Sequence, residues 1–257
     1  MTTTTPVVLT AFGTTAKAFE TYDRMDAIFK ERLPDTPLFW AYSSRMVKRS
    51  LKKNQNIDLK DPGQVLAELK AQGHEWAVVQ SLHLICGHEF DRLREIAGTA
   101  QIRTSMGLPL LTAYDDYTAV ADAICPLISD SDDEATVIVG HGTDHPAWAS
   151  YPALEAVLRK VHGDRVFAGV VEGLPKMEET IAKVKKHGFT RVRLVPFLLV
   201  AGVHFKEDLT REEDSWEKTF QREGIQVNMV NHGVGEIAAV TKLFTSHIKA
   251  ALDVIPR

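Results

Sequence analysis

Short apolar runs alternate with amphipathic stretches along the whole chain. Residues 7–12 form the first apolar run, which ends at Gly13, and apolar positions then recur at helical spacing through residues 16–33. Strands that are apolar throughout and are separated by helices are typical of a parallel sheet covered on both faces. The pattern therefore predicts an α/β protein with doubly wound parallel sheets.

The same alternation predicts the remaining elements. We expect further strands at residues 38–42, 76–84, 107–112, 136–140, 166–171, 191–200 and 225–230. We expect further helices at residues 45–52, 62–72, 87–98, 115–128, 146–161, 175–187, 208–223 and 235–252.

A polar, acidic stretch interrupts this order near the middle of the chain. Residues 129–134 read Ser-Asp-Ser-Asp-Asp-Glu, and the strand–helix order restarts after them. We interpret this stretch as a linker. It predicts an N-terminal α/β domain over residues 1–129 and a second α/β domain over residues 130–234.

The two halves can be aligned on each other. Residues 7–14 match residues 136–143 in type and in the Gly-Thr that ends them, and residues 38–44 match residues 166–172. Residues 73–90 align without a gap on residues 188–205. The identity is low, so the alignment predicts a duplicated plan of strands and helices, that is, two similar domains facing each other.

Chemistry-bearing side chains follow four of the predicted strands. In open parallel sheets, ligands bind outside the carboxyl ends of the strands. The residues found there are His141, Glu172, His204 and Glu89. In the alignment Glu89 is the counterpart of His204, whereas the counterparts of His141 and Glu172 are Phe12 and Ser44, which are not metal ligands. We therefore expect the second half to carry the metal chemistry.

Each of these residues has an ordinary structural interpretation when it is taken alone. His141 lies between two glycines and could be a polar turn residue, Glu172 could be a solvated strand end, and His204 could be a hydrogen-bonded core residue. Together, two imidazoles and one carboxylate at the strand ends of one sheet suit a borderline divalent metal such as Co²⁺, Fe²⁺, Ni²⁺ or Zn²⁺. Three protein ligands leave coordination positions open.

Composition excludes several other classes of protein. The chain has 257 residues, 44% hydrophobic and 25% charged, and a formal net charge of −4. This balance argues against a disordered chain, a nucleic-acid partner or a membrane surface, and no apolar run has the length of a membrane span. The N-terminus has no basic region typical of a signal peptide, and two isolated cysteines fit a reducing compartment. We expect a cytoplasmic protein, or a periplasmic one if a leader has been removed.

A set of short segments is spread across nearly the whole chain: Phe12-Gly13-Thr14, Gln80 to His83 with Gly87 and Glu89, Gly107 to Leu111, Gly140-His141-Gly142, Val171-Glu172 with Pro175, Pro196 to Gly202 with His204, and Asp214-Ser215-Trp216. With these segments the sequence resembles the CbiK-type anaerobic cobaltochelatases, the class II chelatases. The resemblance implies insertion of Co²⁺ into sirohydrochlorin, a precorrin-2-type tetrapyrrole, in anaerobic cobalamin biosynthesis. The sequence contains no nucleotide-binding motif of the GxGxxG or GxxxxGK[ST] kind, which disfavours ATP-driven chelation.

The resemblance also assigns roles to residues. It implies that His141, Glu172 and His204 are the metal ligands, that two ferrochelatase-like domains hold the tetrapyrrole in a cleft, and that residues 235–257 form a helix packed back on the first domain. Our hypothesis is that His141 also accepts a pyrrole proton, because a neutral imidazole can do so near pH 7. We expect Glu89 either to assist proton removal or substrate orientation, or only to stabilise the start of a helix.

Sirohydrochlorin carries eight carboxylates, so basic or amide groups are expected near its binding site. Candidates that lie close together after one strand are Arg45, Lys48, Arg49, Lys52 and Lys53, although such a charge run is often only a solvated helix face. His83 ends a strand and could contact substrate, could bind an accessory haem in a homo-oligomer, or could be a buried structural residue. His88 and His145 add imidazoles beside the expected site, either as extra ligands or as surface side chains.

Two alternative functions follow from the same residues. One is a nickel or iron chelatase of the same fold. The other is a non-enzymatic protein that binds a metal or a tetrapyrrole without turnover.

Overall fold

The chain folds into two compact units, which we describe separately. Unit 1 comprises Met1–Thr112 and Ala238–Arg257, and unit 2 comprises Ala113–Ile237. The computed structural model describes residues 4–14, 19–202, 209–210 and 213–256. The boundary at Thr112 lies before the boundary at residue 129 that the acidic stretch suggested.

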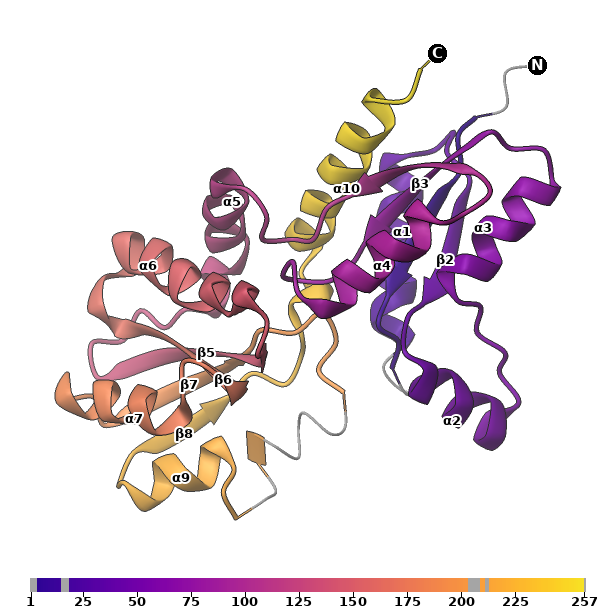
Figure 1. Ribbon diagram of the computed structural model, residues 1–257. Helices are drawn as coiled ribbons and strands as arrows, with labels where there is room; N and C mark the ends of the chain where they lie inside the picture. Colours follow the sequence, from indigo (N-terminus) through magenta and orange to yellow (C-terminus); the bar gives the residue numbers. More distant parts are fainter. Residues whose placement is uncertain (1–3, 15–18, 203–208, 211–212, 257) are drawn as a thin grey trace. The chain divides into compact units, whose positions relative to one another are not determined.

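Unit 1 is built on a four-stranded parallel sheet (Figure 1). Its strands are β1 (Val7–Ala11), β2 (Leu38–Tyr42), β3 (Trp76–Ser81) and β4 (Arg103–Gly107), in the order β2-β1-β3-β4. All five residues of β1 are buried because this strand lies in the sheet interior with helices on both faces.

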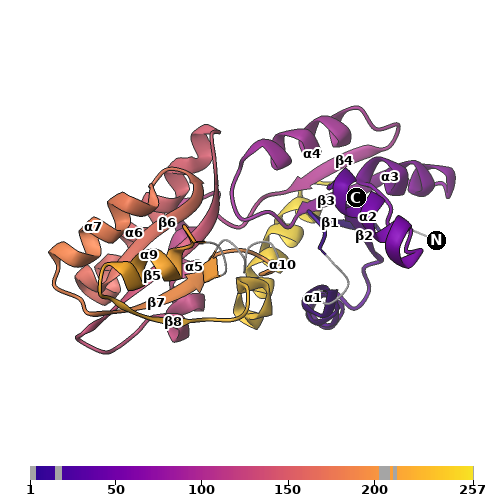
Figure 2. The same ribbon diagram turned by 90° about the horizontal axis from the view of Figure 1, so that it is seen from below.

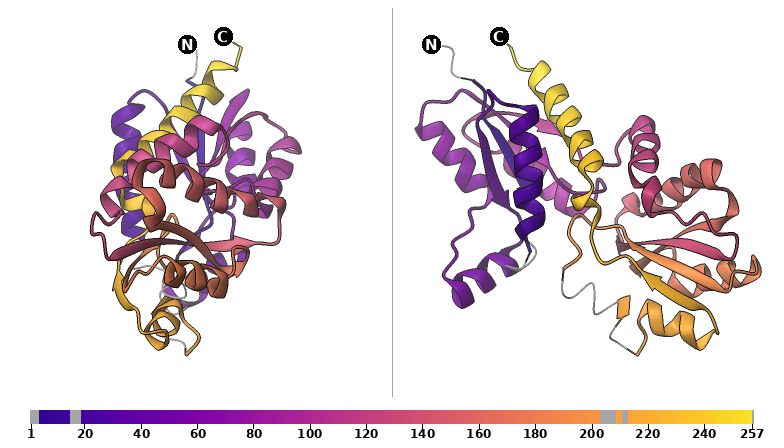
Figure 3. Two further views of the ribbon diagram at one scale, coloured as in Figure 1. Left: turned by 90° about the vertical axis from the view of Figure 1, so that its left-hand side faces the viewer. Right: turned by 180° about the vertical axis from the view of Figure 1, so that it is seen from behind.

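Helices cover both faces of this sheet. On one face, α3 (Pro62–Ala71) and α4 (His88–Gly98) pack against the strands through a buried cluster that includes Val8, Leu66, Val79 and Leu93. On the other face lie α1 (Phe19–Arg32) and α10 (Ala238–Asp253), as Figure 2 shows. The C-terminal helix α10 contacts α1, β3 and β4 (Figure 3). Helix α2 (Arg45–Gln55) follows β2 directly.

Unit 2 repeats this plan. Its parallel strands are β5 (Glu134–Thr143), β6 (Val166–Gly173), β7 (Arg191–Pro196) and β8 (Gln226–Met229), in the order β6-β5-β7-β8. Helices α5 (Tyr114–Ile124) and α6 (Ser150–His162) cover one face, and α7 (Met177–Lys186) and α9 (Trp216–Arg222) cover the other (Figure 1). Short 3₁₀ segments cover Cys125–Leu127, Pro146–Ala149, Gly163–Arg165 and Val234–Glu236.

The two sheets share one register as well as one strand order. Val7 of β1 lies opposite Leu38 of β2, and the residue aligned with Val7, Thr136, lies opposite Val166, which is aligned with Leu38. The pairing of β1 with β3 and that of β5 with β7 correspond in the same way, residue for residue. The prediction of two similar doubly wound parallel sheets is therefore confirmed, and the alignment of the halves correctly identifies equivalent positions at the strand ends.

Two expectations drawn from local composition are wrong. A strand is expected at residues 107–112, but most of this stretch is a loop in which Leu110 and Leu111 are buried in the core. The strand is β4, which starts at Arg103, four residues earlier, and is a polar edge strand rather than an apolar run. The acidic stretch at residues 129–134 lies inside unit 2 rather than between the units. Asp132 and Asp133 stay exposed although they pair with Arg165 and Arg191, whereas Glu134 is buried at the start of β5.

None of the helices in the described part of the chain has both the length and the apolar character needed to cross a membrane.

Candidate functional site

His141 lies near the end of β5 between two glycines that other groups approach closely. A Cβ atom on Gly140 would lie 2.1 Å from a ring carbon of Tyr151. Gly142 has a φ of +91°, and its N–H donates a hydrogen bond to the Tyr151 phenol oxygen at 3.2 Å. Burial raises the pKa of Tyr151, so this side chain is a neutral phenol at physiological pH. Tyr151 therefore fixes the backbone on both sides of His141.

Glu172 lies beside this segment on the neighbouring strand β6. It is in register with Gly142, and a Cβ atom on Gly142 would lie only 1.7 Å from the Glu172 carbonyl oxygen. Neighbouring strands lie about 4.8 Å apart. The structure therefore brings the backbones of His141 and Glu172 to adjacent positions at one edge of the sheet, and both side chains are exposed.

The third expected ligand, His204, lies outside the described residues. By strand alternation, His141 leaves β5 on the face of Val139, whereas Glu172 leaves β6 on the face of Val170. A metal ion bound by both side chains would accordingly lie beyond the strand ends rather than on one face of the sheet. Among the described residues, no group of three or more His, Cys, Asp or Glu side chains is placed to hold a metal ion.

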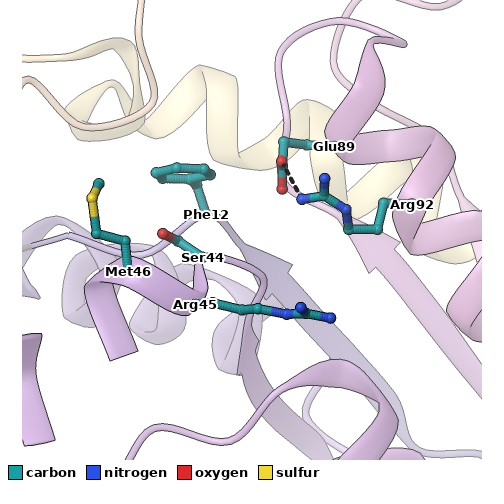
Figure 4. A pocket seen from close by; sticks show the side chains of 6 residues that line it. All are labelled: Phe12, Ser44, Arg45, Met46, Glu89 and Arg92. Atoms are coloured by element: carbon teal, nitrogen blue, oxygen red, sulfur yellow. Dashed lines mark hydrogen bonds and ion pairs between the residues drawn. The ribbon is translucent and has the colours of Figure 1, made fainter. Parts of the chain in front are cut away.

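In unit 1, the three positions equivalent to the proposed ligands are all described. Phe12, Ser44 and Glu89, the counterparts of His141, Glu172 and His204, line one pocket with a volume of about 480 Å³ (Figure 4). The full lining is Phe12, Ser44, Arg45, Met46, Glu89 and Arg92. The three strand-end positions thus converge in the unit where all of them are described.

Glu89 is held in one orientation in this pocket. Its Oε2 atom accepts a hydrogen bond from the Ser43 hydroxyl at 3.0 Å, and its Oε1 atom pairs with the Arg92 guanidinium at 2.9 Å. Glu89 also lies in the first turn of α4, where a carboxylate interacts favourably with the helix dipole. Both the functional and the structural interpretations of Glu89 are therefore compatible with its position.

His83 follows β3 in unit 1 and is mostly enclosed. Its Nδ1 atom shares a hydrogen bond with the Ser81 hydroxyl at 2.8 Å, whereas its Nε2 atom is buried and has no partner within the described residues. Burial lowers the pKa of His83 to about 4, and the nearby Glu89 carboxylate opposes this effect only in part. His83 is consequently a neutral imidazole at physiological pH.

The two additional imidazoles differ in their surroundings. His145 caps the 3₁₀ segment after β5, where its Nδ1 atom accepts a hydrogen bond from the Ala147 N–H at 3.1 Å. This atom is therefore already occupied. His88 is exposed at the first position of α4.

Sequence reasoning missed four residues that shape these positions. Ser43 and Arg92 orient Glu89, Met46 lines the pocket, and Tyr151 supports the backbone around His141. A weak signal existed for Arg92, which lies three residues after Glu89 on a predicted helix, a spacing that favours ion pairs. Ser43 contacts Glu89, 46 positions later in the sequence, which no local pattern reveals. Tyr151 contacts Gly142, only nine positions earlier, but this contact joins a helix to a strand end and has no signature in the helical spacing.

Comparison with known proteins gives a consistent picture. A family model described as "Cobalt chelatase (CbiK)" matches residues 5–253. The sirohydrochlorin cobaltochelatase of Salmonella typhimurium is 34% identical over 227 residues, which is 86% of this chain and 85% of that protein. The sirohydrochlorin cobaltochelatase CbiKC of Nitratidesulfovibrio vulgaris is 30% identical over 263 residues, 97% of this chain and 91% of that protein.

Solved structures agree on the fold. SirB from Bacillus subtilis with Fe³⁺ superposes with a TM-score of 0.69 at 16% identity, over 96% of this chain and 95% of that one. The sirohydrochlorin chelatase SirB from Bacillus subtilis subspecies spizizenii in complex with cobalt gives a TM-score of 0.65 at 14% identity, over 97% and 96% of the two chains. With a family model matched over most of its length and two relatives at 30% identity or more, the chain belongs to the CbiK family of cobalt chelatases.

Proposed function

We propose that this protein catalyses ATP-independent insertion of Co²⁺ into sirohydrochlorin, and that His141, Glu172 and His204 bind the metal. One observation carries the site assignment. The two sheets have the same register, and the counterparts of these residues in unit 1 converge on one pocket. The family and the names of its relatives supply the reaction and the substrate.

The chemistry follows from the proposed ligands. Two imidazoles and one carboxylate hold a divalent cation while leaving positions open, so that Co²⁺, here a substrate, can be passed to the macrocycle nitrogens. Two pyrrole protons must leave during insertion. His141 accepts one of them when it is not bound to metal, and its exposed position between two glycines leaves the ring accessible; the other proton passes to solvent water.

Glu89 supports the reaction by orienting the substrate. Its two oxygens already accept hydrogen bonds from Ser43 and Arg92, which hold the carboxylate in place. A fixed carboxylate can accept a further hydrogen bond from a pyrrole N–H through its remaining lone pairs. We assign the proton-accepting role chiefly to His141 for this reason.

An anaerobic absorption assay tests the proposal. Wild-type protein mixed with Co²⁺ and sirohydrochlorin should change the macrocycle spectrum faster than the same mixture without protein. His141→Ala should lower the rate by about 10²- to 10⁴-fold, the usual contribution of a general base. His204→Ala should also lower the rate strongly, because it removes a proposed metal ligand. His162→Ala, at the end of α6 and away from the strand ends, is the matched control and should retain the wild-type rate.

Several outcomes would contradict the proposal. Full activity of both histidine variants would remove the site assignment. Binding of sirohydrochlorin and Co²⁺ without any acceleration would support a non-enzymatic binding protein, and a faster rate with Ni²⁺ or Fe²⁺ than with Co²⁺ would support a chelatase for another metal.

Three finer expectations stay predictions. An accessory haem at His83 would need an accessible Nε2 atom, whereas this atom is buried. Haem absorption after expression with added haem, compared between wild type and His83→Ala, tests this point. A homo-oligomer and a cytoplasmic location are tested by light scattering and by cell fractionation.

A further inference from the structure

We propose that the pocket of unit 1 binds a peripheral carboxylate of the tetrapyrrole through Arg45 and contacts the adjoining macrocycle edge through Phe12 and Met46. This inference rests on the proposed function, because it assumes that a polyanionic tetrapyrrole is the substrate. It identifies one group, among the basic residues after β2, that recognises the substrate's charge.

The structure separates Arg45 from its basic neighbours. Of the cations on α2, Lys48 pairs with Asp61 at 3.0 Å and Lys52 pairs with Asp58 at 3.2 Å. Arg45 is the one α2 cation that lines the pocket, and within the described residues it forms no ion pair. Its guanidinium is thus available for a carboxylate, which it can bind with two parallel hydrogen bonds.

The second cation of the pocket is already engaged. Arg92 forms an ion pair with Glu89, which Figure 4 shows apart from the Arg45 guanidinium. The Glu89 charge is therefore largely offset by Arg92, and an incoming anion is attracted to Arg45 rather than to the Glu89 end of the pocket. The pocket therefore has one end, at Arg45, where a substrate carboxylate is favoured.

Apolar groups form the other part of the lining. Phe12 is 44% exposed and Met46 is 71% exposed, and both side chains lie beside the pocket (Figure 4). Large apolar side chains exposed next to a cation suit a ligand that combines an apolar ring edge with an acidic substituent. A carboxymethyl or carboxyethyl group on a pyrrole ring has this combination, whereas a hydrated metal ion does not.

Binding of metal-free sirohydrochlorin tests the proposal directly, because it requires no turnover. Titration of the full chain, followed by the change in macrocycle absorption or fluorescence, should show about tenfold weaker binding for Arg45→Gln, as expected for loss of one charge-assisted interaction. Arg49→Gln is the matched control, since Arg49 lies one turn later on α2, is exposed and does not line the pocket. It should bind as the wild type does.

A neutral ligand sharpens the test. When the peripheral acids of the tetrapyrrole are esterified, wild type and Arg45→Gln should bind it equally, and Phe12→Ala should weaken binding of both the acid and the ester. In the chelation assay, Arg45→Gln should raise KM for sirohydrochlorin and leave kcat within about twofold, because ground-state binding alone is lost.

The outcomes separate the two proposals. If the wild type does not bind sirohydrochlorin, both the function and this inference are wrong. If it binds and inserts Co²⁺, and if Arg45→Gln and Arg49→Gln behave alike, the function stands and the role of Arg45 is overturned.

Discussion

Units 1 and 2 have the same backbone plan but present different chemistry at equivalent strand ends. Unit 1 carries Phe12, Ser44 and Glu89 around a pocket that also contains two arginines. Unit 2 carries His141 and Glu172 at the positions of Phe12 and Ser44, and the sequence alignment makes His204 the counterpart of Glu89. One fold thus offers an apolar and cationic surface in one copy and imidazole and carboxylate groups in the other.

This difference shows how two copies of one sheet can bind the two substrates of a reaction, here a metal ion and a tetrapyrrole. The register fixes where the three side chains begin, because neighbouring parallel strands end at the same edge of the sheet. The residue type at each position then decides whether that edge suits a metal ion or an organic acid. We therefore propose that unit 2 binds the metal and that unit 1 binds a carboxylate of the tetrapyrrole.

The largest predicted difference between the units concerns two equivalent glycines. Gly142→Ala should lower activity at least about 100-fold, because the new Cβ would lie 1.7 Å from the Glu172 carbonyl and would displace a proposed ligand. Gly13→Ala places the Cβ 3.2 Å from a movable Val47 methyl, so only the strain of φ +103° is added and the loss should stay below about tenfold. Steady-state chelation rates check both, and equal losses would contradict the comparison.

A second prediction contrasts the acid sensitivity of the two units. Burial raises the pKa of Glu134, but hydrogen bonds from Ser129 and Asn228 and the charge of Arg193 outweigh this, so the pKa lies below its ordinary value. The ionised carboxylate consequently stabilises unit 2 above about pH 4.3, the unfolded value, and this contribution is lost as the pH falls through the lowered pKa. Glu134→Gln should cost about 3 kcal/mol at pH 7 and less in acid, because it leaves Arg193 without its buried partner.

A carboxylate of unit 1 whose pKa is also lowered should matter less. Asp61 caps α3 and pairs with Lys48; these hydrogen bonds outweigh partial burial and lower its pKa, but its side chain is 40% exposed. Asp61→Ala should therefore cost about 1 kcal/mol, the usual value of an N-cap. Urea unfolding of both variants at pH 7 and pH 4 checks the order, and a larger loss for Asp61→Ala would contradict it.

A third prediction concerns the residues that share one position in the alignment, Glu89 and His204. Glu89→Gln keeps the size of the side chain but removes the charge that pairs with Arg92, so kcat/KM should fall about tenfold, the cost of a charged hydrogen bond. His204→Gln should cost far more, because it removes a proposed metal ligand. Steady-state kinetics of the two variants measure the ratio of their losses in kcat/KM. A ratio near one would show that the two positions contribute equally to the reaction.

The smallest effect is expected at His83, whose aligned residue in unit 2 is Leu198. His83→Leu copies that residue and removes a buried Nε2 atom that has no partner in the described structure. We expect the free energy of unfolding to change by less than about 1 kcal/mol, because loss of the Ser81 hydrogen bond is offset by removal of a buried polar atom. A tenfold fall in kcat/KM would instead show that His83 contacts the substrate.

The sequence was most informative where apolar patterning and chain alignment act together. The runs at residues 7–12 and 38–42 coincide closely with β1 and β2, and the aligned halves have the same register in the structure. The polar edge strand β4 was misplaced because an edge strand need not be apolar. Of the pocket residues, Phe12, Ser44, Arg45 and Glu89 could be singled out from sequence, and Arg92 lies at helical spacing from Glu89. Met46, and the hydrogen bond that Ser43 donates to Glu89, required the tertiary structure.

The central claim is that the strand ends of unit 2 bind the metal and that those of unit 1 do not. A crystal of the full chain soaked in Co²⁺, with anomalous diffraction recorded at the cobalt edge, tests it most directly. The account predicts one strong peak about 2.0–2.2 Å from a nitrogen of His141, a nitrogen of His204 and an oxygen of Glu172. A peak beside Glu89 in the pocket of unit 1, with none at His141, would contradict it.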